Sequence, residues 1–99
     1  MDYKVEFKDP FLDDLEQIVR AIAVENAGAA RKLGELIVGT AEALEFFPER
    51  HPRVRQRPML RRYIVGRTYK VFYRILHEAK TVEILRCWDG RRGSEPKIE

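Results

Sequence analysis

The side chains that could do chemistry are concentrated in the second half of this chain, and most of them are cationic. Residues 50–99 carry fourteen Lys and Arg against five Asp and Glu, a net charge of +9. Residues 1–49 carry five against eleven, a net charge of −6. Solvation of a small domain explains a high charge content but not this segregation. We therefore expect a polyanion or an acidic protein segment as the partner of the second half.

Seven of these cations lie in or beside expected strands and are candidates for contact with a target. Arg suits phosphate groups because its planar guanidinium donates two hydrogen bonds at once. The candidate target-binding residues are Arg61, Arg62, Lys70, Arg74, Arg86, Arg91 and Arg92.

The first half is expected to supply a strand and a helical hairpin. Residues 3–8 alternate apolar and charged side chains, which is typical of a half-buried strand. Asp9 and Pro10 form a helix start, because Asp accepts a bond from a free backbone N–H and Pro suits the first helical position. Apolar residues at helical spacing predict this helix up to about residue 26 and a second one over 30–47. The short connection makes the two helices antiparallel.

The second half is expected to supply a loop and three strands. Residues 48–58 contain three prolines and predict a loop. Strands follow at 60–65, 68–77 and 81–88, joined by short turns and therefore antiparallel. The polar residues 89–99 are expected to form a flexible tail. The predicted fold is one α+β domain over 1–99, with the helical hairpin packed on one face of a curled sheet.

The C-terminal strands resemble those of the RelE/ParE toxins. Residues 60–75 read LRRYIVGRTYKVFYRI, and residues 82–92 read VEILRCWDGRR. This family typically shows an Arg-bearing strand, an aromatic–basic–hydrophobic–Tyr strand, and a hydrophobic strand that runs into a basic turn. The order of the upstream elements also matches, so the resemblance covers nearly the whole chain. It implies the toxin of a bacterial type II toxin–antitoxin, or plasmid stabilisation, system.

Two activities are known in this family, and the fold does not choose between them: ribosome-dependent cleavage of mRNA and inhibition of DNA gyrase. Metal-independent RNA cleavage needs a base for the 2′-hydroxyl, cations for the phosphate and an acid for the leaving oxygen. RNA-cleaving relatives usually carry a His, a Tyr or a further basic side chain where the last strand leaves the sheet. Here that segment reads WDGRR, and no His or Tyr follows. The weak catalytic candidates are Glu49, Arg61, Lys70, Arg86 and Asp89.

Each candidate acid or base also has a structural interpretation. Asp89 lies among arginines and is expected to be ionised in a salt bridge. Glu49 falls at a helix end, and His51 is a loop side chain whose basic neighbours disfavour protonation. Tyr69 and Tyr73 share the apolar face of their strand and are expected to pack in the core. This incomplete set favours ParE-like inhibition of gyrase over a ribosome-dependent endoribonuclease. A non-toxic basic nucleic-acid-binding module is the alternative from another class.

The resemblance also implies a cognate antitoxin, with which this chain would form a hetero-oligomer. An acidic amphipathic segment would place its apolar side chains against the apolar faces of the helices. Its carboxylates would be attracted to the second half of the chain, whose net charge is +9. The expected antitoxin-binding residues are Leu15, Ile18, Ile22, Leu33 and Ile37.

The remaining observations indicate neither a cofactor nor a membrane. No His, Cys and carboxylate cluster has metal-ligand spacing, so no metal or other cofactor is expected. The lone Cys87 is expected to be a small apolar residue of a strand. No apolar run approaches the roughly 20 residues that a membrane span needs, and no signal segment precedes the domain. We therefore expect a cytoplasmic protein.

Overall fold

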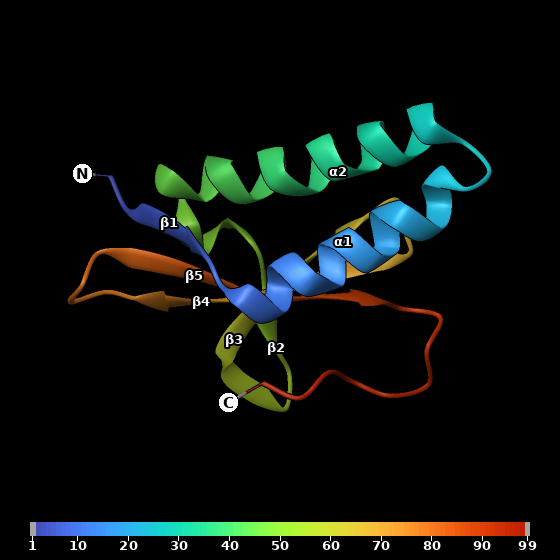
Figure 1. The fold of residues 1–99 in the computed structure, drawn as a ribbon. Helices are drawn as coiled ribbons and strands as arrows, with labels where there is room; N and C mark the ends of the chain where they lie inside the picture. Colours follow the sequence, from blue (N-terminus) through green and yellow to red (C-terminus); the bar gives the residue numbers. More distant parts are fainter. Residues whose placement is uncertain (1, 99) are drawn as a thin grey trace.

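A computed structural model describes residues 2–98, in which two helices lie over one face of a five-stranded sheet (Figure 1). Strand β1 (Lys4–Phe7) leads into α1 (Asp9–Ala23) and α2 (Ala27–Glu42), and two 3-10 turns follow at Ala43–Glu45 and Pro48–Arg50. The remaining strands are β2 (Arg53–Val54), β3 (Arg57–Val65), β4 (Tyr69–Leu76) and β5 (Thr81–Asp89). The predicted α+β fold is confirmed.

The sheet is mixed, with the order β1-β5-β4-β3-β2. β2, β3, β4 and β5 pair antiparallel, as the short turns between them require. β1 instead lies parallel to β5, with Phe7 opposite Ile84. The last strand therefore sits between the first strand and β4, and the long connection that this parallel pair needs runs through the helical hairpin and the other three strands.

Several predicted boundaries differ from the structure, and the first helix, predicted up to about residue 26, ends at Ala23. The expected loop over 48–58 contains β2 and the start of β3, where Pro58 is tolerated because the β2–β3 ladder shifts register at this edge of the sheet. The second helix begins at Ala27 because the Asn26 side chain accepts a bond from the Ala29 N–H at 2.9 Å. It ends at Glu42, where the chain tightens into a 3-10 turn before Pro48.

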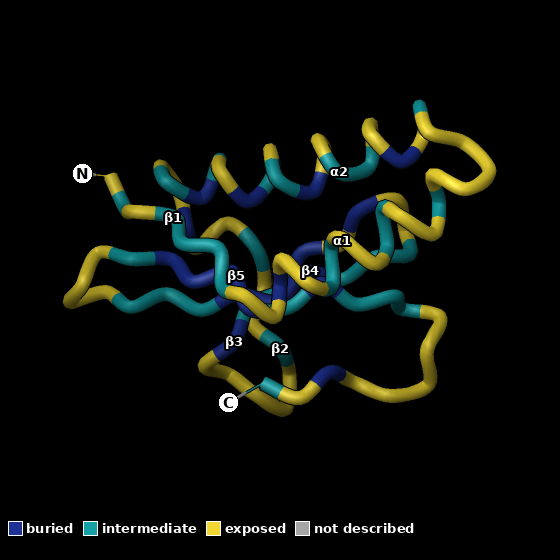
Figure 2. The backbone as a smooth tube through the Cα atoms, viewed as in Figure 1, coloured by how far each residue is buried: buried dark blue, intermediate teal, exposed yellow. Residues whose placement is uncertain are grey.

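The core lies between the helical hairpin and the sheet, where buried segments of α2 and of the strands face each other (Figure 2). Phe11 and Ile37 from the helices are fully buried there with strand residues such as Ile84. Two tyrosines complete it. The Tyr63 hydroxyl donates to the Ile37 carbonyl and the Tyr73 hydroxyl to the Pro48 carbonyl, both at 2.8 Å. Each buried hydroxyl is thus satisfied, as burial requires.

Residues 90–98 form no helix or strand and run back beneath the sheet, on the side away from the helices (Figure 1). Trp88 Nε1 donates to the Ser94 carbonyl at 2.7 Å, and Arg86 Nη1 donates to the Lys97 carbonyl at 3.0 Å. Pro96 is buried. The segment expected as a flexible tail therefore has defined contacts, and its mobility stays a prediction.

One ion pair joins α1 to the sheet. β1 ends at Phe7 while β5 continues to Asp89, so β5 has no neighbouring strand on that side beyond Ile84. The Asp14 carboxylate accepts a bond from the Cys87 N–H at 3.1 Å and two from the Arg86 guanidinium, at 2.6 and 2.9 Å. The bond to Asp14 raises the pKa of Arg86. The two side chains are only 21% and 14% exposed, so this pair is protected from water.

Replacement of Asp14 by Ala is expected to lower the free energy of unfolding by about 2–3 kcal/mol, because the largely buried Arg86 then lacks its carboxylate. Urea unfolding followed by circular dichroism measures the change. Glu16→Ala is the control on the same helix, because it removes an exposed pair with Arg20 and should cost less than about 0.5 kcal/mol. Equal effects of the two variants would contradict the structural role of Asp14.

Candidate functional site

A groove of about 770 Å³ lies between α1 and the end of β5, and we call it the α1–β5 groove. Ile18 and Ile22 line it from the helix. Trp88 and the basic turn with Arg91 and Arg92 line it from the sheet side. The helix side also carries the polar side chains of Asp14, Gln17 and Glu25, so the groove sets two isoleucines among polar residues opposite a cationic turn.

Trp88 holds two of the groove's cations in place. The Arg92 guanidinium carbon lies 4.5 Å from the centroid of the indole ring, and that of Arg86 lies 5.5 Å from it. Such cation–π contacts favour guanidinium groups over the ring face. Trp88 lies outside the core cluster and positions these arginines.

Asp89 is held by Arg91 and is unsuited to proton transfer. It accepts bonds from Arg91 Nη2 at 2.8 Å, from Nε at 3.0 Å and from the backbone N–H at 2.9 Å. The bonds from the Arg91 side chain, more than any other cause, lower the pKa of Asp89 to about 2. The carboxyl is thus ionised at neutral pH, in agreement with its predicted structural role.

The weak catalytic candidates fall into two separate groups. Lys70, Arg86 and Asp89 lie at the groove end of β4 and β5, where Lys70 pairs with Trp88. Arg61 of β3 lies opposite Tyr73, further along β4, and Glu49 of the preceding 3-10 turn lies beside Arg61. Three residues of extended chain separate the two positions on β4, a distance of about 10 Å.

In the second group, Arg61 fastens the loop that follows the helices. Its Nη1 donates to the His51 carbonyl at 2.7 Å and to the Glu49 carbonyl at 3.3 Å. Its Nη2 lies 3.9 Å from Glu49 Oε2, which is also 3.9 Å from His77 Nε2. The Arg61 side chain is only 15% exposed. Its position fits an anchor of the loop better than a contact with a target.

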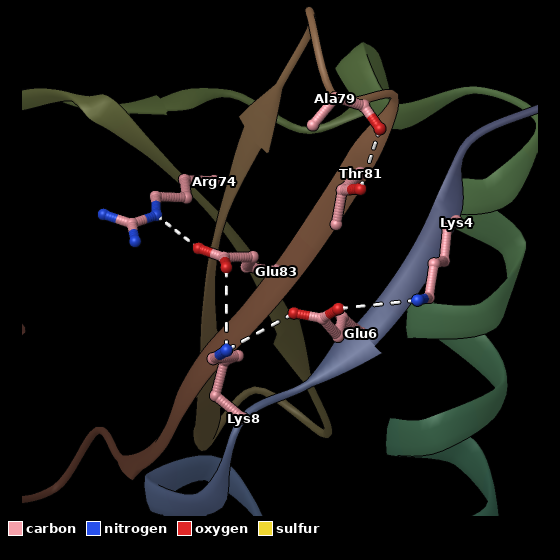
Figure 3. A network of polar contacts seen from close by, with 7 residues as sticks. All are labelled: Lys4, Glu6, Lys8, Arg74, Ala79, Thr81 and Glu83. Atoms are coloured by element: carbon pink, nitrogen blue, oxygen red, sulfur yellow. Dashed lines mark hydrogen bonds and ion pairs between the residues drawn. The ribbon is translucent and has the colours of Figure 1, made fainter.

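Most of the predicted target-binding cations already have an acidic partner. Glu83, which is only 8% exposed, binds Arg74 at 2.7 Å, and the network extends to Lys8 and Glu6 of the first strand and the turn after it (Figure 3). The bond from Lys8 to Glu6 raises the pKa of this lysine. The other pairs are Arg61–Glu49, Lys70–Glu95, Arg86–Asp14 and Arg91–Asp89. Within residues 2–98, only Arg62 and Arg92 of the seven form no ion pair.

Burial keeps the titratable groups of the core, and His51 beside it, in their uncharged forms. Burial raises the pKa of Tyr73 and of Cys87 to about 12, and it raises that of Tyr63 as well. Burial and, secondarily, Arg50 lower the pKa of His51, whose ring centroid lies 5.2 Å from that of Tyr63. Cys87 is confirmed as a small buried residue of a strand.

The predicted antitoxin-binding residues are placed unequally. Ile37 is fully buried in the core and presents no surface to a partner. Leu33 also packs against the core, whereas Ile18 and Ile22 line the α1–β5 groove. Leu15 lines a second, more apolar groove of about 600 Å³ between α1 and α2.

Three exposed arginines were missed by the sequence analysis. Arg53, Arg55 and Arg57 lie around the tight turn between β2 and β3, and none of them has an ion pair within the described part of the chain. A signal was available, because residues 50–62 contain six arginines and no Asp or Glu. The prolines had favoured interpretation of this segment as a loop only.

Within residues 2–98, no group of three or more His, Cys, Asp or Glu side chains is placed to hold a metal ion. Neither helix is long and apolar enough to cross a membrane.

A sequence model of the ParE toxin of type II toxin–antitoxin systems, parDE, matches residues 5–93. The chain therefore belongs to this toxin family, and the predicted RelE/ParE membership is confirmed. It is a toxin of a type II toxin–antitoxin system. A search of curated protein sequences gave no significant match.

Solved structures from both RelE-type and ParE-type toxin systems share the fold. A chain of the RelBE2 toxin–antitoxin complex from Mycobacterium tuberculosis is 27% identical, with a TM-score of 0.66 over 90% of this chain and 99% of that one. The chromosomal ParDE system of P. aeruginosa matches at 20% identity, with a TM-score of 0.75 over 88% and 95%. The isolated E. coli RelE toxin matches at 16% identity, with a TM-score of 0.60 over 92% and 87%. The last two likenesses concern the fold alone.

The Asp89 carboxyl is expected to titrate near pH 2 in the folded protein, and Arg91→Ala should raise its pKa towards the ordinary value of 3.8. Because the pKa is lowered by folding, the ion pair is complete above about pH 4 and is lost as the pH falls towards 2. Carboxyl ¹³C NMR titration measures both midpoints. A midpoint above 5 in the unmutated chain would restore Asp89 as a candidate base.

Proposed function

We propose that this chain arrests bacterial growth by ParE-like inhibition of DNA gyrase. The supporting observation is the composition of the α1–β5 groove. Of the three carboxylates that line it, Asp14 and Asp89 are bound by arginines while Glu25 has no ion pair within residues 2–98, and no histidine of the described chain lines it. Binding to a protein target needs no proton transfer, whereas RNA cleavage does. The match to the ParE family model supports the same choice.

The target-binding surface is proposed to centre on the basic turn at the end of β5. Arg92 stacks on Trp88 and has no ion pair within residues 2–98, so its guanidinium edge is free to donate bonds. Arg91 is 74% exposed even while it holds Asp89. Such partly satisfied arginines beside an aromatic ring are typical of energetically important contacts in protein interfaces.

The α1–β5 groove is also proposed to receive the cognate antitoxin. An amphipathic acidic segment would bury apolar side chains against Ile18 and Ile22 and place its carboxylates near Arg91 and Arg92. Occupation of the groove would cover the basic turn and thereby neutralise the toxin. The similar M. tuberculosis structure is itself a toxin–antitoxin complex.

Ribosome-dependent mRNA cleavage is the second candidate, and one observation favours it. Glu49 lies 3.9 Å from both Arg61 and the exposed His77, so a carboxylate, an imidazole and a guanidinium meet outside the α1–β5 groove. These are the groups that acid–base cleavage with charge stabilisation requires.

The purified chain is expected to block supercoiling of relaxed plasmid by gyrase and to leave ribosome-bound mRNA intact. Arg92→Glu should weaken inhibition at least about tenfold, because it reverses an unpaired charge at the proposed contact. Arg31→Glu, on the exposed surface of α2, is the matched control.

Codon-specific cuts in translated mRNA with normal supercoiling would replace this proposal by the cleavage mechanism. In that case Glu49→Gln and His77→Gln should abolish the cuts. Normal growth after induction without any partner would overturn both toxic functions and support a nucleic-acid-binding module instead.

Ile22→Asp is expected to weaken the antitoxin complex about 10- to 100-fold, because a carboxylate would be buried against an acidic segment. The affinity for the product of an adjacent small gene is measured by isothermal titration calorimetry. Val24→Asp provides a control, since Val24 is 82% exposed near the end of the same helix and lines neither groove. Equal losses in the two variants would rule out the groove as the docking surface.

A further inference from the structure

The turn between β2 and β3 carries cations that the fold leaves without acidic partners. We call residues 53–57 the arginine hairpin. Arg53, Arg55 and Arg57 are all exposed, and none has an ion pair within residues 2–98. Within residues 2–98 their side chains make one hydrogen bond, from Arg57 Nη2 to the Ile98 carbonyl at 2.7 Å. The hairpin projects from the helix-covered part of the sheet, and its tip is exposed (Figures 1 and 2).

The contrast with the other cations is informative. Arg61, Arg74 and Arg86 each meet a carboxylate and stabilise the fold through it. In the arginine hairpin, the ladder instead places Arg53 directly opposite Arg61. Like charges at opposed positions destabilise a sheet, and nothing within the described chain offsets the charge of Arg53. An anionic ligand would offset it.

The surroundings of these arginines indicate the class of anion. A peptide needs apolar or aromatic anchors, but the arginine hairpin contains one aliphatic residue, Val54, which is half-buried. A phosphodiester backbone needs only cations that reach its oxygens, and arginine suits it best. The absence of an aromatic residue in 53–57 also removes the platform on which bases would stack.

We propose that the arginine hairpin binds the phosphodiester backbone of a nucleic acid without regard to its sequence. In the strand order β5 is second and β2 is fifth, so β4 and β3 lie between the strand of the α1–β5 groove and the arginine hairpin. The two surfaces come nearest at the C-terminal segment, where Arg57 and Arg86 donate to the neighbouring carbonyls of Ile98 and Lys97. With β3 and β4 between them, the two strands lie about 14 Å apart. The toxin can therefore hold a protein at one site and a nucleic acid at the other.

The test compares two full-length triple variants that lose the same charge. One carries Arg53→Gln, Arg55→Gln and Arg57→Gln, and the other carries Arg20→Gln, Arg31→Gln and Lys32→Gln on the helices. Fluorescence anisotropy measures the binding of a labelled RNA of about 20 nucleotides and a DNA of about 20 base pairs, at salt concentrations between about 50 and 200 mM. Circular dichroism checks that both variants are folded.

The hairpin variant is expected to bind at least about tenfold more weakly at 100 mM salt. Its slope of log K against log salt should fall by about 2–3, since each lost phosphate contact removes about 0.7–0.9. The helix variant should keep the unmutated slope. Tighter binding of the RNA or of the DNA supports the proposal and identifies the source of the phosphates.

Two results would overturn the proposal. Equal losses in the two triple variants would mean that only net charge matters. Binding of poly-glutamate as tight as that of either oligonucleotide, and equally sensitive to the hairpin variant, would assign the surface to an acidic protein. Gyrase inhibition is measured separately on the unmutated chain, so failure here leaves the proposed function standing.

Discussion

The unequal lengths of β1 and β5 impose the constraint on which the groove depends. β1 stops at Phe7, and the edge of β5 beyond Ile84 needs another partner for its backbone N–H groups. Asp14 supplies it, and the same carboxylate binds the Arg86 guanidinium. Because residues four apart share one face of a helix, fixing Asp14 against β5 also directs Ile18 and Ile22 towards that strand. The position of these two isoleucines in the groove follows from this contact.

A bulge in β5 makes the same contact possible. Phe72 pairs with Arg86 and Tyr73 with Ile84, so Leu85 is an extra residue in the ladder. Strict alternation would place Ile84 and Cys87 on opposite faces, yet both belong to the core cluster. The extra residue restores Cys87 to the helix side, where its N–H reaches Asp14. Arg86 is then held between α1 and the Trp88 ring.

The cations of this protein serve two purposes, and net charge does not distinguish them. Arg61 fastens a loop, and Arg74 neutralises the buried Glu83 within the network of the first strand. These residues form part of the fold. The surfaces left for partners differ in chemistry: the groove joins isoleucines to arginines and suits a protein, whereas the arginine hairpin offers cations alone and suits phosphates.

The α+β class, the helical hairpin, the three long strands and the family could all be predicted from the sequence. Periodicity, helix starts and tight turns depend on neighbouring residues, so they can be predicted locally. The pairing of β1 with β5 and the short strand β2 depend on contacts between distant segments. The ion-pair partner of an arginine also depends on such contacts, since Asp14 and Arg86 are 72 residues apart. Only the tertiary structure could therefore decide that Arg86 stabilises the fold while Arg53 remains exposed, because a charge meets its partner through space and not along the chain.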